Sequence, residues 1–254
     1  MKEYEAIAGV YDILNADVDY SAWADGIEAV FDRFLDKRPE LVLDLACGTG
    51  RMTFELARRG YDMIGADISA DMLMRARAKQ EEENILWLMQ DMRSFELYGT
   101  VGAVVCCLDA VNYLLSDDDV IKCFKTVHNY LDDGGLFLFD VNSPYKFENV
   151  FADNAYILEE DGIYCGWQNE YDKESGICHF YLSVFKERSD GRYERYDEEQ
   201  SERCYSTAAL GAALEESGFE VLGFFGGHDM SPVGAESERI YAVAKKKQKN
   251  QKKF

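Results

Sequence analysis

Three acidic residues stand at or directly after three successive apolar segments of this sequence. Asp44 ends the first segment and opens the run Asp44-Leu45-Ala46-Cys47-Gly48-Thr49-Gly50. Its carboxylate can accept hydrogen bonds from an ammonium group or its bridging water, and the glycines let the backbone approach a ligand closely. Asp67 ends the second segment, where an acid can bind both hydroxyls of a ribose. Asp91 follows the third, where it can accept a hydrogen bond from the adenine amine. The set predicts a nucleoside-containing cofactor.

The glycine-rich run argues against a dinucleotide as that cofactor. The dinucleotide fingerprint needs a third small residue, in the pattern Gly-x-Gly-x-x-Gly/Ala, for close packing of helix on strand. Here Gly48 and Gly50 are followed by Arg51, Met52 and Thr53. A pyrophosphate would also lie close to the carboxylate of Asp44. An oxidoreductase on a nucleotide-binding fold therefore remains only as an alternative.

Strand and helix patterns alternate from residue 41 to about residue 141. Apolar runs predict strands at 41–46, 61–67, 85–90, 101–108 and 136–141, and amphipathic patterns predict helices at 50–59, 70–82 and 117–131. This alternation is typical of a parallel sheet with right-handed crossovers. The three acids then fall at the carboxyl ends of their strands, where open parallel sheets bind ligands.

The pattern changes after Pro144. Residues 150–205 alternate apolar and polar side chains, with turn signals at 161–162, 174–176 and 189–191. This predicts three or four antiparallel strands inserted into the α/β unit. About 55 residues make only a marginal core alone, so we expect the insertion near the site rather than as an independent domain. A helix at 206–217 and strands near 219–226 and 238–245 complete the α/β pattern.

Together these motifs resemble those of class I S-adenosylmethionine-dependent methyltransferases. The resemblance rests on 44–50, Asp67, Asp91 and the stretch Cys106-Cys107-Leu108-Asp109, covers roughly residues 35–145 and resumes at 206–245. It implies a doubly wound, Rossmann-like, mostly parallel seven-stranded sheet of the α/β class, with S-adenosylmethionine as cofactor. Residues 150–205 look like the antiparallel β insertion of a bacterial subgroup. The expected parts are 1–149 with 206–246 for the cofactor, 150–205 for the insertion, and a basic, disordered tail at 247–254.

The resemblance also implies where each part of the cofactor lies. Gly48 and Gly50 would line the methionine part, Asp67 would bind the ribose, and Asp91 with Met92 the adenine. The backbone carbonyl of Leu108 would accept from the ammonium. Aromatic residues near the N-terminus are expected at the cofactor carboxylate and as a lid, with ordinary packing as the alternative. The expected cofactor contacts are Tyr11, Tyr20, Trp23, Asp44, Ala46, Cys47, Gly48, Gly50, Asp67, Ile68, Asp91, Met92 and Leu108.

Methyl transfer from a sulfonium is an in-line displacement, so the enzyme mainly aligns the acceptor and excludes water. Asp109 and His228 are the candidates for a catalytic base, if one is needed. Further candidates near the acceptor are Tyr113, Asp140, His179, Asn112, Asn142 and Arg239. No Asn/Asp-Pro-Pro-Tyr/Phe tetrapeptide follows the fourth strand, which argues against methylation of exocyclic base amines or glutamine amides. We expect methylation of N or O of a small molecule.

The amino-acid composition limits the classes of partner that the protein is expected to bind. A formal net charge of −21 disfavours nucleic acids and anionic lipids. The six lysines of Lys245–Phe254 leave an RNA or protein methyltransferase as the alternative, and a non-catalytic cofactor-binding protein is a second one. Seven cysteines without Cys-x-x-Cys spacing favour reduced thiols and no metal site. With no signal peptide and no apolar run of roughly 18–20 residues, a cytoplasmic protein is expected. Oligomeric state is not predicted.

The insertion is rich in aromatic residues. They include Tyr164, Trp167, Tyr171, Phe180 and Tyr181. We expect the insertion and the N-terminal segment to roof the acceptor site. The alternative is that these side chains form only the small core of the insertion.

Overall fold

The computed structural model describes residues 8, 11–81 and 83–247, so only Lys247 of the predicted basic tail lies within the described residues. Its main sheet has seven strands in the order β10-β11-β5-β4-β1-β2-β3. Strands β1 to β5 run parallel, and β11 runs antiparallel to both β5 and β10. The strands are β1 Leu41–Leu45, β2 Asp62–Asp67, β3 Leu86–Met89, β4 Val101–Cys106, β5 Leu131–Asn142, β10 Phe219–Phe225 and β11 Arg239–Lys246.

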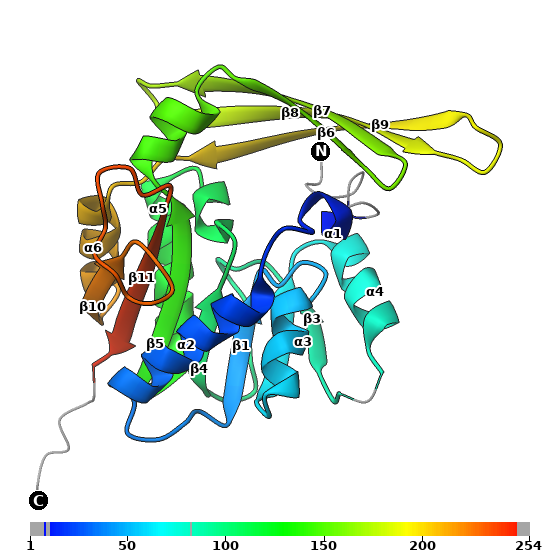
Figure 1. Ribbon diagram of the computed structural model, residues 1–254. Coiled ribbons are helices and arrows are strands. Elements are labelled where there is room, and N and C mark those ends of the chain that lie inside the picture. The colour runs from blue at the N-terminus through cyan, green and yellow to red at the C-terminus, as the bar shows by residue number, and fades with distance from the viewer. Residues whose placement is uncertain (1–7, 9–10, 82, 248–254) are drawn as a thin grey trace, which may run out of the picture.

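Helices cover both faces of this sheet (Figure 1), which confirms the predicted doubly wound α/β fold. One face carries α2, α3 and α4, and the other carries α5 and α6. A short helix, α1, precedes them. The helices are α1 Tyr11–Leu14, α2 Tyr20–Phe34, α3 Arg51–Arg58, α4 Ala70–Lys79, α5 Asp117–Tyr130 and α6 Thr207–Glu216. In the described part of the chain, no helix has the length and apolar character needed to span a bilayer.

The sequence explains the start of several helices and the position of the central strands. Ser69, Ser116 and Ser206 each accept a backbone N–H at the first turn of α4, α5 and α6. The central strands β1 and β4 are apolar on both sides because helices cover both faces, and Val42 and Val104 are fully buried.

Two strand boundaries differ from the predicted ones by two residues or more, and the predicted helix 70–82 ends at Lys79. Strand β5 begins at Leu131, five residues before the predicted start, because Leu131 already pairs with Val101 ahead of an irregularity in the ladder. Strand β4 ends at Cys106, since Leu108 and Asp109 adopt positive φ values of 59° and 54° and turn the chain out of the sheet.

The insertion forms a second, four-stranded antiparallel sheet in the order β6-β7-β8-β9. It lies across the carboxyl edge of the main sheet (Figure 1). Phe147 and Phe151 of the π-helix η2 (Lys146–Phe151) fill its inner face. Trp167, Tyr171 and Phe180 belong to the same cluster. The strands are β6 Ala155–Glu160, β7 Ile163–Asp172, β8 Ile177–Glu187 and β9 Tyr193–Arg203.

Gly50 is predicted to be required for packing α3 and the sheet together. A Cβ there would lie 2.5 Å from Cη2 of Trp87, and φ is +80°, whereas Gly60 has φ +89° and open space. We expect Gly60→Ala to lower the free energy of unfolding by about 1 kcal/mol. Gly50→Ala should cost about 2 kcal/mol more, because the indole must move. Urea unfolding of both variants measures the difference, and equal losses would contradict this role of Trp87.

Candidate functional site

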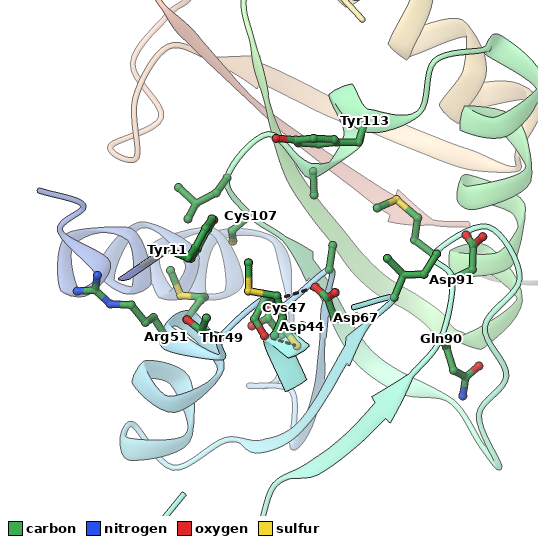
Figure 2. A pocket seen from close by; sticks show the side chains of 18 of the residues that line it. Tyr11, Asp44, Cys47, Thr49, Arg51, Asp67, Gln90, Asp91, Cys107 and Tyr113 are labelled. Atoms are coloured by element: carbon green, nitrogen blue, oxygen red, sulfur yellow. Dashed lines mark hydrogen bonds between the residues drawn. The ribbon is translucent and has the colours of Figure 1, made fainter. Parts of the chain in front are cut away.

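A cavity opens at the carboxyl ends of β1, β2 and β4 (Figure 2). Its floor is the loop between β1 and α3, and Tyr113 of the short helix η1 (Ala110–Tyr113) lies above it. The lining residues are Tyr11, Tyr20, Asp44, Ala46, Cys47, Gly48, Thr49, Arg51, Met52, Asp67, Ile68, Met72, Gln90, Asp91, Met92, Arg93, Cys107, Leu108, Ala110, Tyr113 and Leu114.

Asp67 ties two loops of the cavity together. One carboxylate oxygen accepts the N–H of Gly48 at 2.8 Å, and the other accepts the N–H of Ser69 at 2.7 Å. Burial raises the pKa of Asp67, and these two backbone bonds oppose that rise. Each oxygen has a second lone pair for a ligand hydroxyl. The arrangement can therefore hold a pair of hydroxyl groups without moving.

Asp44 is a buried acid without a cationic partner among the described residues. It is 1 % exposed, and its carboxylate accepts the hydroxyl of Thr53 at 2.5 Å. Burial raises the pKa of Asp44 to about 7, against the lowering effect of the Thr53 hydrogen bond. A cation entering the cavity would favour the ionised form of this carboxyl. Asp44 is thus suited to an ammonium or its bridging water.

Asp91 lies on the β3 side of the cavity and is neutralised by its neighbour. The Arg93 guanidinium donates to both carboxylate oxygens, from Nε at 3.0 Å and from Nη2 at 2.6 Å. This pairing holds the pKa of Asp91 below its usual range. The carboxylate keeps a fixed orientation, with lone pairs left for a ligand amine.

The N-terminal segment closes one side of the cavity. The Thr49 hydroxyl donates to the Asp12 carboxylate at 2.5 Å. Arg51 donates to the Asn15 carbonyl at 3.0 Å, and its guanidinium lies 4.3 Å from the centre of the Tyr20 ring. These contacts place the Tyr11 and Tyr20 rings, which both line the cavity, on its N-terminal side.

The loop after β4 is fixed by a buried carboxylate from β5. Asp140, 1 % exposed, accepts the N–H of Leu108 at 2.7 Å and the N–H of Asp109 at 2.9 Å. Arg239 of β11 pairs with Asp140 and, at 2.7 Å, with the Asp109 side chain. These bonds hold two residues in the left-handed region, which costs energy for non-glycine residues. Leu108, which lines the cavity, is thereby held in place.

Comparison with known proteins decides the family. Residues 42–135 match a methyltransferase domain model. YqeM of Bacillus subtilis, a methyltransferase by name, is 34 % identical over 96 % of this chain and 97 % of its own length. A crystal structure of an S-adenosylmethionine-dependent methyltransferase from Clostridium acetobutylicum superposes with a TM-score of 0.87 and 31 % identity, covering 96 % of this chain and 99 % of that chain. The chain belongs to the class I S-adenosylmethionine-dependent methyltransferases.

One further relative has a known type of acceptor. A dTDP-3-amino-3,4,6-trideoxy-α-D-glucopyranose N,N-dimethyltransferase of Streptomyces venezuelae is 31 % identical, over 61 % of this chain and 65 % of its own length. The family confirms the predicted cofactor, S-adenosylmethionine. Among the described residues of this methyltransferase, no group of three or more His, Cys, Asp or Glu side chains is placed to hold a metal ion.

The structure brings most of the predicted cofactor contacts into one cavity. They come from the N-terminal segment and from the ends of β1, β2, β3 and β4. Those that line it are Tyr11, Tyr20, Asp44, Ala46, Cys47, Gly48, Asp67, Ile68, Asp91, Met92 and Leu108.

Two predicted site residues lie elsewhere. Trp23 packs against His228 and Tyr241, at ring-centroid distances of 4.9 Å and 5.2 Å, in a separate apolar pocket between α2 and β11. Trp23 therefore does not line the cavity, and its contact with the cofactor stays a prediction. His228, predicted as a base, lines the same apolar pocket and not the cavity, while Cys107 lines both.

Gly50 and Asp109 are also absent from the cavity lining. Gly50 packs against the Trp87 ring and does not line the cavity. The Asp109 carboxylate pairs with Arg239 at 2.7 Å, and Asp109 does not line the cavity. Their predicted roles at the methionine part and as a base stay predictions.

Several residues of the site were absent from the predicted set. Thr53 follows Gly50 at helical spacing, and its hydrogen bond to Asp44 has no sequence signal beyond that position. Arg93 stands two residues after Asp91, a spacing that allows the observed ion pair. Arg51 begins α3 and lines the cavity. Its position directly after the glycine-rich run was a sequence signal that could have identified it as a site residue.

Asp140 is predicted to position the Leu108 carbonyl for cofactor binding. Asp140→Asn should weaken S-adenosylhomocysteine binding about tenfold, because one accepting oxygen is lost and the buried Arg239 keeps only Asp109 as an anionic partner. Asp109→Asn removes a charge from the same ion pair but leaves both backbone bonds of Asp140 in place. Calorimetric titration should therefore give Asp109→Asn an affinity within about threefold of the wild type. Equal losses in both variants would contradict the positioning role.

Proposed function

We propose that this methyltransferase transfers the methyl group of S-adenosylmethionine to the nitrogen of a small-molecule amine. The observation that carries the proposal is that η1 and the insertion, joined by hydrogen bonds, together cover the end of β4. The Tyr113 hydroxyl donates to Gln200 of the insertion at 3.0 Å, and Asn112 donates to the Arg203 carbonyl at 2.8 Å. This cover supports a small acceptor. The amino-sugar N,N-dimethyltransferase among its relatives supports nitrogen as the accepting atom.

The cavity residues fit the cofactor part by part. Asp67 would accept from the ribose hydroxyls and Asp91 from the adenine amine. Asp44 and the Leu108 carbonyl would bind the ammonium of the methionine part. Arg51 would pair with its carboxylate, since the other cationic lining residue, Arg93, is already paired with Asp91. When bound, the cofactor supplies a methyl group already activated by its sulfonium.

The protein's own contribution is alignment and exclusion of water. Residues 150–205 would serve as the acceptor roof, and residues 1–149 with 206–246 as the cofactor-binding part. Asp109 would help to fix the loop after β4 through its ion pair with Arg239. The amine would then enter the site in its neutral form, so the transfer rate should rise with pH until the free amine predominates.

The test is transfer of a labelled methyl group to a panel of small amines. Wild-type enzyme should label at least one primary or secondary amine in the panel, and an Asp67→Ala variant should label none. A protein that binds S-adenosylmethionine but labels only RNA or protein in parallel reactions would contradict a small-molecule acceptor.

A further inference from the structure

The apolar pocket between α2 and β11 lies beside the cofactor cavity. It holds about 440 Å³ of space, its open mouth included. Side chains of α2, β5, β10 and β11 form its walls, together with Gly227, His228 and Met230 of the loop between β10 and β11. This loop lies so close to α2 that a Cβ on Gly26 would be 2.6 Å from the Cβ of His228. The pocket is therefore a recess between a helix and the sheet.

Apolar side chains make up most of this lining. They include Ile27, Val30, Leu138 and Val243, which are all buried. The acidic lining residue, Asp140, is already paired with Arg239. A lining of this kind favours a hydrocarbon group over a polar or charged one, because a polar group would lose its hydration without gaining a partner.

Cys107 separates the pocket from the cofactor cavity. It directly follows β4, is half-buried and lines both hollows (Figure 2). In the strand register Cys106 of β4 lies opposite Phe139, and the next residue of β5, Asp140, lies opposite Tyr241 of β11. One end of the pocket is therefore at the carboxyl edge of the sheet, no more than one side chain away from the cavity.

From this end the pocket extends away from the cavity. Trp23 contacts Tyr241 at the carboxyl edge, with ring centroids 5.2 Å apart. Val30, which also lines the pocket, is seven residues further along α2, roughly 10 Å down the helix axis. On the sheet side, Val243 is two residues beyond Tyr241, roughly 7 Å along β11. A short hydrocarbon chain can lie along this depth with its polar end beside Cys107.

We propose that this pocket binds the hydrocarbon part of the methyl acceptor, with the amine nitrogen in the cavity beside Cys107. The inference rests on the proposed function and narrows its substrate class to amines that carry an apolar chain. The cofactor would occupy the ends of β1, β2 and β3, so the acceptor has to approach from the β4 side. The pocket opens on that side, between β4 and the strands β5 and β11.

Binding is tested by nuclear magnetic resonance of the isoleucine δ1-methyl groups in protein saturated with S-adenosylhomocysteine. Ile27 lines the pocket and Ile68 lines the cofactor cavity, so one spectrum reports on both places. Each signal is assigned from its absence in an Ile27→Val or Ile68→Val variant. The probes are n-hexylamine and 2-(2-aminoethoxy)ethanol, a polar amine of the same chain length.

The Ile27 signal should move with n-hexylamine and stay in place with 2-(2-aminoethoxy)ethanol, while the Ile68 signal stays in place with both. An Ile27 signal that n-hexylamine does not move, or that both amines move equally, overturns the proposal.

Turnover tests whether the occupied pocket serves methyl transfer. For the wild type, kcat/KM should rise about fourfold with each added methylene from ethylamine to n-butylamine. Val30→Phe places a larger side chain in the pocket and should abolish this rise, with an unchanged Kd for S-adenosylmethionine. Ala29→Phe, on the exposed face of α2, is the matched control and should keep the rise.

The outcomes separate this proposal from the proposed function. A rise that survives in Val30→Phe, or a wild type that methylates all these amines equally well, overturns the acceptor role of the pocket. Absence of methyl transfer to every amine tested counts against the proposed function, and the isoleucine titration still decides whether the pocket binds the chain of an amine.

Discussion

Replacing Asp67 with alanine is expected to weaken S-adenosylhomocysteine binding by about a hundredfold or more. The variant loses the carboxylate that would accept both ribose hydroxyls, and charge-assisted bonds of this kind are the stronger ones. It also leaves the N–H groups of Gly48 and Ser69 without their present acceptor, so the glycine-rich loop loses its tie to β2. Calorimetric titration measures the loss.

The control for this prediction is Asp62→Ala. Asp62 lies at the opposite end of the same strand, is exposed, and is far from the cavity lining. It should bind the ligand as tightly as the wild type. If a folded Asp67→Ala protein, checked by circular dichroism, keeps wild-type affinity, the ribose does not lie at the end of β2.

Asp44→Asn is expected to stabilise the ligand-free protein while weakening cofactor binding at least tenfold. Burial raises the pKa of Asp44 from 3.8 to about 7, so the native state holds this proton more tightly than the unfolded chain. The free energy of unfolding of the wild type therefore falls as pH rises from about 4 to about 7. Above that range the buried carboxylate is ionised and its full destabilising effect is present. Asparagine has no such cost and still accepts the Thr53 hydroxyl. At pH 8 the variant should be more stable by about 2–4 kcal/mol.

Urea unfolding at pH 5 and pH 8 checks the sign of this effect. The advantage of Asp44→Asn over the wild type should be smaller at pH 5 and larger at pH 8, whereas Asp62→Asn should show no such trend. Cofactor affinity of the wild type should fall as pH drops below 7, because binding the ammonium requires the ionised carboxyl. An asparagine variant with wild-type affinity would exclude Asp44 from the ammonium site. A stability advantage over the wild type that is the same at pH 5 and pH 8 would contradict the raised pKa of Asp44.

The sheet and the acid positions were predictable because they depend on local pattern. Alternating strands and helices place consecutive strand ends at one edge, so Asp44, Asp67 and Asp91 had to converge there. The four-stranded insertion was predictable for the same reason, since its period-two alternation and turn residues are local signals.

Contacts between distant segments were not predictable. Arg239 reaches Asp109 and Asp140 only because β11 pairs antiparallel with β5, which sets Arg239 opposite Asn142. No local signal gives that register. Trp23 follows Tyr20 on α2 by about one helical turn, roughly 4.5 Å along the axis, and that rise carries it past the cavity to the β10–β11 loop.

A crystal structure with S-adenosylhomocysteine bound tests the central claim most directly. We expect the ribose hydroxyls on Asp67, the adenine beside Asp91 and Met92, and the amino group at Asp44 and the Leu108 carbonyl, with the sulfur facing Tyr113. A ligand seated instead in the apolar pocket of Trp23 and His228, or one that makes no contact with Asp67, would contradict the assignment of the cofactor site.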